Sequence, residues 1–123
     1  MPPKAEVLVV EDDNRWQENY ARMLPGGGHS VAATVRHIFD AADAIHDLKE
    51  SGARIDVAIV DGNLGRSNYG EDGSAVVFML RRDFPDAKIL GITSDPNGVA
   101  GADVNLNKAT MNPMELAGIV TRL

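Results

Sequence analysis

The sequence predicts a doubly wound α/β domain, in which helices cover both faces of one parallel five-stranded sheet. Two observations predict this fold class. Short apolar, β-branched segments alternate along the 123 residues with segments whose apolar side chains recur at helical spacing. In addition, polar residues that can carry chemistry follow four of the five predicted strands. Strands joined by helical crossovers run parallel, and such sheets bind ligands beyond the carboxyl ends of their strands.

The first predicted strand, residues 7–10, is an apolar β-branched run that stops at acidic residues, as a strand buried on both faces would. Residues 14–24 then place apolar side chains on one helical stripe. Either Asp12 or Asp13 can cap the start of this helix, and Pro25 with the following glycines is expected to end it. The chain therefore opens with a strand and a half-buried helix.

The alternation continues through the middle of the chain. Residues 30–35 predict a second strand, and Asp40 is expected to cap a helix that runs through Lys49. The next strand, residues 55–60, leads to a helix over about residues 73–84.

The last part of the chain departs from strict alternation. Strands at residues 88–92 and 104–106 are separated by a connection that contains residues 95–98, whose sequence Asp-Pro-Asn-Gly is typical of turns. A fourth helix between these strands is therefore expected to be one turn or nearly lost. A final helix is expected over about residues 113–123. No linker or internal repeat is evident, so residues 1–123 are expected to form a single domain.

Composition argues against several classes of function. The net charge is −6 and the longest basic run is Arg81-Arg82, so direct binding of nucleic acid is not expected. The absence of cysteine excludes disulfides and thiolate metal sites. No apolar run approaches the roughly 20 residues of a membrane span, so a cytoplasmic location without membrane contact is expected. His29, His37 and His46 share no ligand-like spacing and are expected to be surface or packing residues.

The carboxyl ends of the strands define a candidate site. The first, third, fourth and fifth strands deliver, in order, Glu11-Asp12-Asp13, Asp61, Thr93-Ser94 and Asn107-Lys108. Several carboxylates at one edge repel one another unless a cation or protons neutralise them. Because the available ligands are oxygens, Mg²⁺ bound partly through water is the expected cofactor. With the metal and Lys108 beside it, Asp61 could attack a phosphoryl donor, and Thr93 could donate its hydroxyl to a phosphoryl oxygen.

These segments, taken in order, resemble the CheY-like receiver domains of response regulators in two-component signalling. The resemblance spans nearly the whole chain and rests on residues 7–13, 57–61, 91–94 and 106–108. It implies the strand order 2-1-3-4-5. It also implies a sensor histidine kinase or a phosphotransfer protein as phosphoryl donor, and a downstream effector protein or a second copy of the chain as partner. Such a domain is a switch, with at most self-catalysed phosphoryl transfer, rather than an enzyme.

The resemblance also implies roles for individual residues. Asp61 matches the phosphoacceptor, Thr93 the switch hydroxyl and Lys108 the lysine that pairs with the phosphoryl group. The residues that match the Mg²⁺ ligands are Glu11, Asp12, Asp61 and Asn63, the last through its backbone carbonyl. Three more residues are expected near the site without binding the metal directly: Asp13, Ser94 and Arg66.

The sequence departs from the family's pattern at several places. Ala109 stands where the family usually has a proline after its lysine, and Asn105 stands where it often has an aromatic residue that swings inward on activation. The segment 65–72 is longer than the family's usual loop. It is expected to be a surface loop, in which Arg66 could reach the phosphoryl group.

Three other functions compete with this interpretation. A flavodoxin-like FMN site occupies the same edge, but the acidic residues after the first strand would repel a phosphate. A phosphatase of the haloacid dehalogenase type needs a second acid two residues after its nucleophile, where this chain has Asn63. A receiver-like interaction or dimerisation module that does not depend on phosphorylation stays open. Retention of Asp61, Thr93 and Lys108 together favours phosphorylation, because a silent module has no physical need for a cluster of repelling charges.

Overall fold

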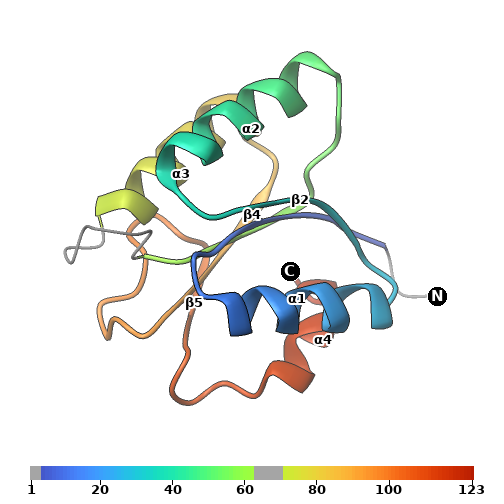
Figure 1. The fold of residues 1–123 in the computed structure, drawn as a ribbon, viewed down its shortest axis with the longest axis vertical. Coiled ribbons are helices and arrows are strands. Elements are labelled where there is room, and N and C mark those ends of the chain that lie inside the picture. Colours follow the sequence, from blue (N-terminus) through green and yellow to red (C-terminus); the bar gives the residue numbers. More distant parts are fainter. Residues whose placement is uncertain (1–3, 63–70) are drawn as a thin grey trace.

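The computed structural model describes residues 4–62 and 71–123, and these residues form one parallel sheet with the strand order β2-β1-β3-β4-β5 (Figure 1). The predicted fold class and strand order are confirmed. The strands are β1 (Glu6–Val10), β2 (Ser30–Val35), β3 (Val57–Val60), β4 (Lys88–Thr93) and β5 (Val104–Asn107). The α-helices are α1 (Asn14–Gly26), α2 (Ile38–Glu50), α3 (Glu71–Asp83) and α4 (Leu116–Thr121), the last preceded by a 3-10 turn at Pro113–Glu115.

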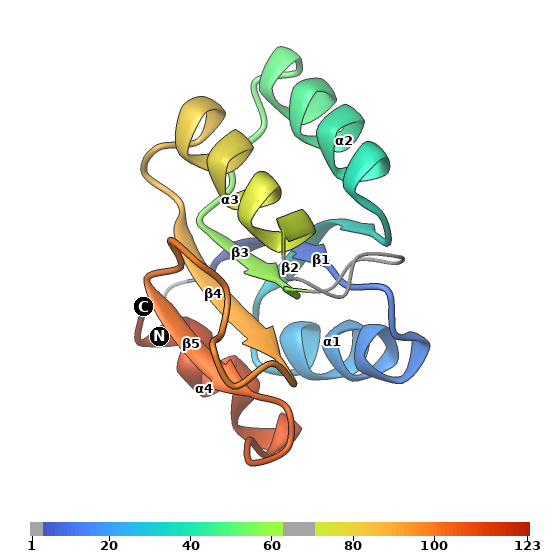
Figure 2. The same cartoon turned by 90° about the vertical axis from the view of Figure 1, so that its left-hand side faces the viewer.

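Helices cover both faces of the sheet: α2 and α3 pack on one face, and α1 and α4 on the other (Figures 1 and 2). Successive residues of a strand point to opposite faces, so each central strand feeds both layers. In β1, Leu8 and Val10 join the cluster beside α2 and α3, whereas Val7 and Val9 join the cluster beside α1 and α4. A strand buried on both faces has no polar side, which explains the continuous apolar runs in the sequence.

Helix α1 continues beyond its predicted end at Leu24, through Pro25 to Gly26. It stops at Gly28, whose φ of 89° lies in the left-handed region that glycine adopts without strain, and the N–H groups of Gly28 and His29 donate to the carbonyl oxygens of Pro25 and Leu24. The glycines after Pro25 therefore end the helix, two residues later than predicted. A β-carbon at Gly27 would clash with the Cβ of Ala117 in α4, so only glycine allows the two helices to approach this closely.

Helix α2 begins without the cap predicted for it. Its N-cap is His37, whose side chain makes no capping hydrogen bond, and Asp40 lies in the first turn of the helix. A carboxylate there interacts favourably with the unpaired N–H groups at a helix start, so an acidic residue in the first turn resembles a cap in the sequence. The prediction of Asp40 as the cap is therefore wrong, although the helix itself is present.

The connection between β4 and β5, residues 94–103, consists of turns rather than a helix. The fourth helix of the family's pattern, expected to be short, is replaced altogether. Val99 of this connection is 1% exposed and packs against the cluster beside α2 and α3. Asn105 of β5 clamps it: the Asn105 Oδ1 accepts a hydrogen bond from the Val99 N–H at 2.8 Å, and Nδ2 donates to the Val99 carbonyl oxygen at 3.4 Å. One buried residue and one side-chain clamp thus cover this part of the sheet.

His29 ties the start of β1 to α4. It is buried, its Nδ1 accepts a hydrogen bond from the Ala5 N–H at 3.1 Å, and its Nε2 lies 3.0 Å from both the Ala117 carbonyl oxygen and the Thr121 hydroxyl. Because Nδ1 is the acceptor, the neutral ring carries its proton on Nε2 and donates it toward α4. His29 is therefore a packing residue, as predicted.

Candidate functional site

The structure brings the predicted strand-end residues together at the carboxyl edge of the sheet, the edge that faces the viewer in Figure 2. Because all the strands run parallel, their carboxyl ends meet at this one edge. Glu11 and Asp61 are almost fully buried at the ends of β1 and β3, and Thr93 is buried at the end of β4. The residues gathered there from four strands are Glu11, Asp12, Asp61, Thr93 and Lys108.

Lys108 lies at the centre of this group. Its Nζ lies 2.8 Å from Glu11 Oε1 and donates a hydrogen bond to Asp61 Oδ2 at 3.0 Å. Burial lowers the pKa of Lys108, but the two carboxylates outweigh this effect and the net pKa is raised. The ammonium also lies 5.5 Å from the centre of the Trp16 ring, within the range of a cation–π contact. Lys108 therefore stays charged and joins β1, β3 and β5.

The pKa of Glu11 is raised by its surroundings. Burial, together with the neighbouring Asp61, raises the pKa of Glu11 to about 8, even though Lys108 acts in the opposite direction. Burial and the charges of Glu11 and Asp61 likewise raise the pKa of the Tyr20 hydroxyl on α1. The site therefore has more negative charge than one ammonium can neutralise, and Glu11 holds a proton in much of the population near neutral pH.

The residues present fit a hard divalent cation. Glu11, Asp12 and Asp61 each offer one carboxylate oxygen, and these oxygens lie within 4.8 Å of one another. An all-oxygen set of this kind suits Mg²⁺, which keeps several waters and takes one or two carboxylates. A bound cation would add positive charge beside the buried carboxylates of Glu11 and Asp61, which share the single ammonium of Lys108.

A turn after β5 aims Lys108 without the proline of the family's pattern. The Lys108–Ala109 peptide is not cis. The Asn107 Oδ1 accepts a hydrogen bond from the Ala109 N–H at 2.8 Å, and the Asn107 carbonyl oxygen accepts from two further amides of the turn. The Lys108 N–H donates to the Thr93 carbonyl oxygen at 3.0 Å, which extends the pairing with β4. A proline at position 109 has no N–H, so this arrangement requires another residue there.

Thr93 directs its side chain toward the neighbourhood of Asp61. Its Oγ1 lies 3.4 Å from where a β-carbon on Gly62 would stand, directly after Asp61 in the chain. The same oxygen accepts a hydrogen bond from the Asp95 N–H at 3.3 Å, so the hydroxyl hydrogen is not used in that bond. Thr93 is thus placed at the start of the helix-free connection as well as beside the acidic group.

The structure places the residues that were expected near the site, without binding the metal, in different surroundings. Asp13 is the N-cap of α1, and its carboxylate accepts hydrogen bonds from the N–H groups of Arg15 and of the next residue. This confirms its predicted role as a helix cap. Ser94 is exposed. Asn63, expected to offer a carbonyl oxygen, and Arg66 both lie outside the described residues.

Sequence reasoning missed Arg36, which follows β2 and reaches the same edge. Its guanidinium donates to the Asp12 carbonyl oxygen at 2.9 Å and to side-chain oxygens of Asn14 and Gln17. A signal was available in the sequence. Arg36 is the polar residue directly after the second strand, so it belongs to the same edge as the polar residues that follow the other four strands.

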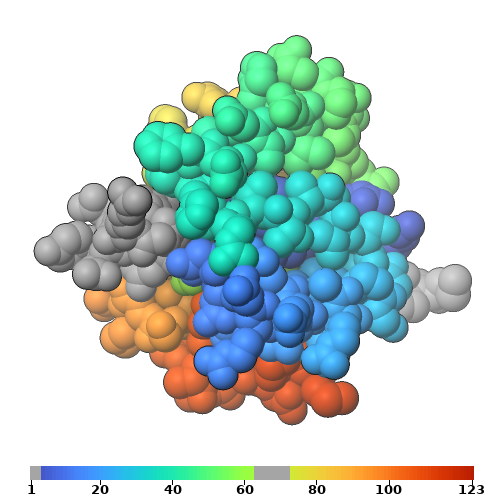
Figure 3. Space-filling view, viewed as in Figure 1, coloured from blue at the N-terminus to red at the C-terminus, as the bar shows by residue number. Residues whose placement is uncertain are grey.

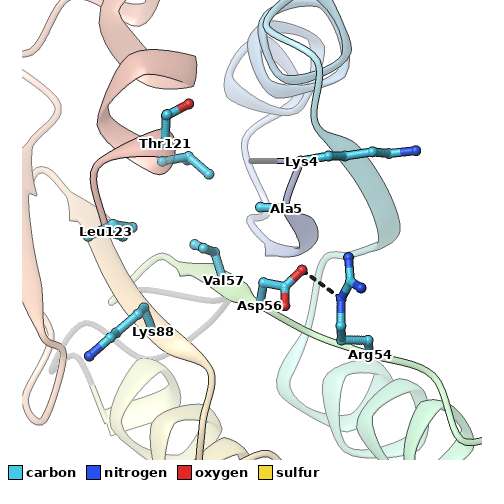
Figure 4. Close-up of a pocket in the computed structure, with 9 residues that line it drawn as sticks. Lys4, Ala5, Arg54, Asp56, Val57, Lys88, Thr121 and Leu123 are labelled. Carbon is cyan, nitrogen blue, oxygen red and sulfur yellow. Dashed lines mark hydrogen bonds and ion pairs between the residues drawn. The ribbon is translucent and has the colours of Figure 1, made fainter. Parts of the chain in front are cut away.

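A pocket of about 330 Å³ lies at the opposite edge of the sheet, where the strands begin (Figure 4). Its Asp56 accepts a hydrogen bond from the Glu6 N–H at 2.8 Å and pairs with Arg54 at 2.9 Å. Lys4 and Lys88 extend away from its centre in opposite directions (Figure 4). Asp56 is therefore engaged in fixing strand ends, and the pocket is separate from the acidic group.

No protein-family model matches the sequence, and no curated protein matches it significantly. Solved structures do match. The receiver domain of the sensor histidine kinase PA1611 from Pseudomonas aeruginosa, with a magnesium ion in its active-site cleft, is 23% identical with a TM-score of 0.75, over 98% of this chain and 97% of that one. A CheY-like receiver domain protein from Methanospirillum hungatei is 19% identical with a TM-score of 0.73, over 98% and 93%.

A variant of the anti-anti-sigma factor PhyR from Bartonella quintana is 23% identical with a TM-score of 0.74, over 98% of this chain and 49% of that one. The chain thus spans about half the length of PhyR. Receiver domains of response regulators are its structural neighbours over nearly its whole length, and the chain has their fold. At these identities the likeness establishes the fold, and the chemistry has to be argued from the residues themselves.

Proposed function

We propose that the chain is a receiver domain in which Asp61 accepts a phosphoryl group with the help of Mg²⁺. The donor is a sensor histidine kinase or a phosphotransfer protein, and phosphorylation changes the conformation and the partner binding of the domain. One observation carries the proposal: Lys108 joins the buried carboxylates of Glu11 and Asp61 at 2.8 and 3.0 Å, with Asp12 close enough to share a metal. Burying these charges opposes folding, so the group fits a role in charge chemistry better than a role in packing.

Glu11, Asp12 and Asp61 are the side chains that would hold Mg²⁺, and the resemblance adds the backbone carbonyl of Asn63. When bound, the ion would neutralise the negative charge that a phosphoryl group brings to this edge. The all-oxygen donor set and the raised pKa of Glu11 support this assignment. The magnesium ion in the PA1611 receiver structure is in line with it.

The transfer itself requires little of the protein beyond positioning. A carboxylate oxygen of Asp61 attacks phosphorus, the bond between phosphorus and its donor atom breaks, and the donor atom leaves with the electron pair. Lys108 would exchange its contact with Glu11 for one with a phosphoryl oxygen, and Thr93 would donate its hydroxyl to another. The domain acts as a switch, and its only chemistry is transfer to Asp61 and hydrolysis from it.

Intact mass after incubation with Mg²⁺ and a small phosphoryl donor such as acetyl phosphate tests the proposal. The wild type is expected to gain one labile phosphate, and Asp61→Asn none. Asp86→Asn is the matched control, because Asp86 is exposed in a turn far from the site, and it should gain phosphate as the wild type does. A wild type that binds Mg²⁺ but forms no adduct would contradict the proposal, as would an adduct on Asp61→Asn.

A receiver-like interaction or dimerisation module independent of phosphorylation is the second candidate. The connection between β4 and β5 favours it, because the helix is replaced by turns and Asn105 is bonded to Val99. A switch that moves an aromatic side chain inward cannot operate at Asn105. The mass experiment separates the two functions, since a silent module forms no adduct at Asp61.

The output of the proposed switch is binding to an effector protein or to a second copy of the chain. Direct binding of nucleic acid is not part of the proposal, because the net charge is −6. In the part of the chain that the structure describes, no helix has the length and apolar character needed to cross a bilayer. A cytoplasmic location belongs to the proposal, together with the two-component kinase as partner.

A further inference from the structure

We propose that Arg36 is a positioning residue of the metal site. It holds the segment between β1 and α1, which carries Glu11 and Asp12, so that both carboxylates are in place before a metal binds. The inference rests on the proposed function, because it assigns a new role at the same site. No motif that supports the family resemblance includes the residue after β2.

Arg36 reaches this segment from the neighbouring strand. Its Nη2 donates to the Asp12 carbonyl oxygen at 2.9 Å, and its Nη1 donates to Gln17 Oε1 at 3.2 Å. Nη1 also donates to the side-chain oxygen of Asn14. The planar guanidinium has a rigid fork of donors, so one acceptor on this segment and two at the start of α1 fix the segment and the side chain relative to each other.

Gln17 extends the contact to Glu11. Its Oε1 accepts from Arg36, while its Nε2 donates to the Glu11 carbonyl oxygen. On the other side, the Glu11 N–H donates to the Val35 carbonyl oxygen of β2 at 2.9 Å. Arg36 therefore holds the backbone of Asp12 directly and that of Glu11 through Gln17, while β2 holds the Glu11 N–H.

Arg36 has two opposing effects on metal affinity. Its charge repels a cation, whereas its hydrogen bonds preorganise the ligands. The guanidinium is exposed, so water and salt screen its charge, but its bonds are made locally and are not lost by screening. Residues that orient metal ligands change metal affinity by about 10- to 100-fold when removed. The positioning effect therefore dominates, and removal of Arg36 is expected to weaken Mg²⁺ binding.

The test is the Mg²⁺ dissociation constant of the chain, titrated with MgCl₂ and followed by calorimetry and by the fluorescence of Trp16, the only tryptophan. Arg36→Ala should raise this constant about tenfold, since Arg36 orients backbone rather than the carboxylates themselves. Arg36→Lys should recover part of the loss, because an ammonium can still donate to one of these acceptors although it lacks the fork of donors. Arg22→Ala, an exposed change of the same charge on α1, should leave the constant within about twofold of wild type.

Amide hydrogen exchange of the metal-free protein supplies a second measurement. The Asp13 N–H donates to Glu11 Oε2 at 3.2 Å, and it should exchange faster in Arg36→Ala than in Arg22→Ala. The amides of β3, which do not contact Arg36, should exchange alike in both variants. Faster exchange throughout the sheet would indicate a general loss of stability and would overturn the assigned role.

The outcomes for Arg36 and for the proposed function can be told apart. A wild type that binds no Mg²⁺ would overturn the proposed function and this inference together. A wild type that binds Mg²⁺ with an affinity that Arg36→Ala leaves unchanged would overturn the inference alone. Tighter binding by Arg36→Ala would also overturn it, because the charge of Arg36 would then outweigh its hydrogen bonds.

Discussion

The two sides of the carboxyl edge differ in what they retain. On the β1 and β3 side, Glu11 and Asp61 are buried, and Lys108 reaches them from the end of β5. On the β4 and β5 side, the connection that begins after Thr93 consists of turns, and its first residue, Ser94, is exposed. In the space-filling view the segment after β4, drawn in orange, lies at the surface of this edge (Figure 3). The β1 and β3 side thus supplies the buried carboxylates, whereas the β4 and β5 side supplies Lys108 beside a connection without a helix.

The comparison shows that a strand fixes the position of the residue that follows it, whereas a connection between strands can take different structures. A residue directly after a buried strand is placed by the sheet, so Glu11 and Asp61 are set once β1 and β3 pair in register. A crossover only has to return the chain and cover part of one face. Val99 and Asn105 are enough for that here. The positions of Glu11 and Asp61 therefore do not depend on whether the connection between β4 and β5 contains a helix.

The largest expected effect comes from removing Lys108, the cation that reaches the buried carboxylates from the end of β5. Lys108→Met leaves two carboxylates facing each other without an ammonium. The free energy of unfolding of the metal-free protein is expected to fall by about 3 kcal/mol, the lower end for breaking a buried pair because Glu11 can take up a proton. Saturating Mg²⁺ should restore more stability to this variant than to wild type. Urea unfolding with and without Mg²⁺ measures both changes.

The matched control for Lys108→Met is Lys88→Met, since Lys88 is exposed at the start of β4 on the opposite edge. This change should move the free energy of unfolding by less than about 0.5 kcal/mol. If Lys108→Met proved as stable as Lys88→Met, Lys108 would not be balancing the acidic group.

The next effect is a dependence of stability on pH that Glu11 causes. Its pKa is about 8 in the folded protein against an ordinary value of 4.5. Between these values the folded state holds a proton that the unfolded state lacks, so this contribution is complete below pH 4.5 and is lost as the pH rises through about 8. The free energy of unfolding of metal-free protein should therefore fall over this window relative to Glu11→Gln, which cannot ionise. Parallel pH profiles of the two proteins would contradict the raised pKa.

The smallest of the three effects on stability is expected in the connection between β4 and β5. Asn105→Ala removes the acceptor of the Val99 N–H and leaves this amide without its partner beside the core. The free energy of unfolding is expected to fall by about 1–2 kcal/mol, and the Val99 amide should exchange faster with solvent. Asn97→Ala, in the same connection but exposed, is the control and should have little effect. Equal stability of the two variants would show that Asn105 does not hold the connection.

Local patterns were sufficient for the fold because the strands are short, apolar and buried on both faces. Residues 30–35 were predicted with the bounds that the structure gives. The errors lie at the ends of elements: α1 runs two residues past Leu24 before Gly28 ends it, and Asp40 lies in the first turn of α2 rather than at its cap. Turn signals at residues 95–98 indicated a reduced helix, but the clamp by Asn105 is a contact between side chain and backbone that no local pattern encodes.

The site was predictable to the extent that it sits on strand ends. Glu11, Asp61 and Lys108 converge as expected, because the sheet places each of them. The raised pKa of Glu11 depends on burial and on Asp61 nearby, and therefore emerges only in the folded chain. Arg36 is exposed and acts through hydrogen bonds to residues far away in the sequence, so its residue type alone did not mark it.

The position of β5 at the edge of the sheet has a consequence for association between molecules. An open sheet edge can serve as a template for a strand of another chain, and fibrils grow from such edges. Here the edge strand has only four residues. The side chains of Asn105 and Asn107 bond within their own chain, and Asp103, directly before the strand, pairs with Arg81 at 3.1 Å. The short strand and its charged entry make this edge a poor template, so β5 can end the sheet without promoting aggregation.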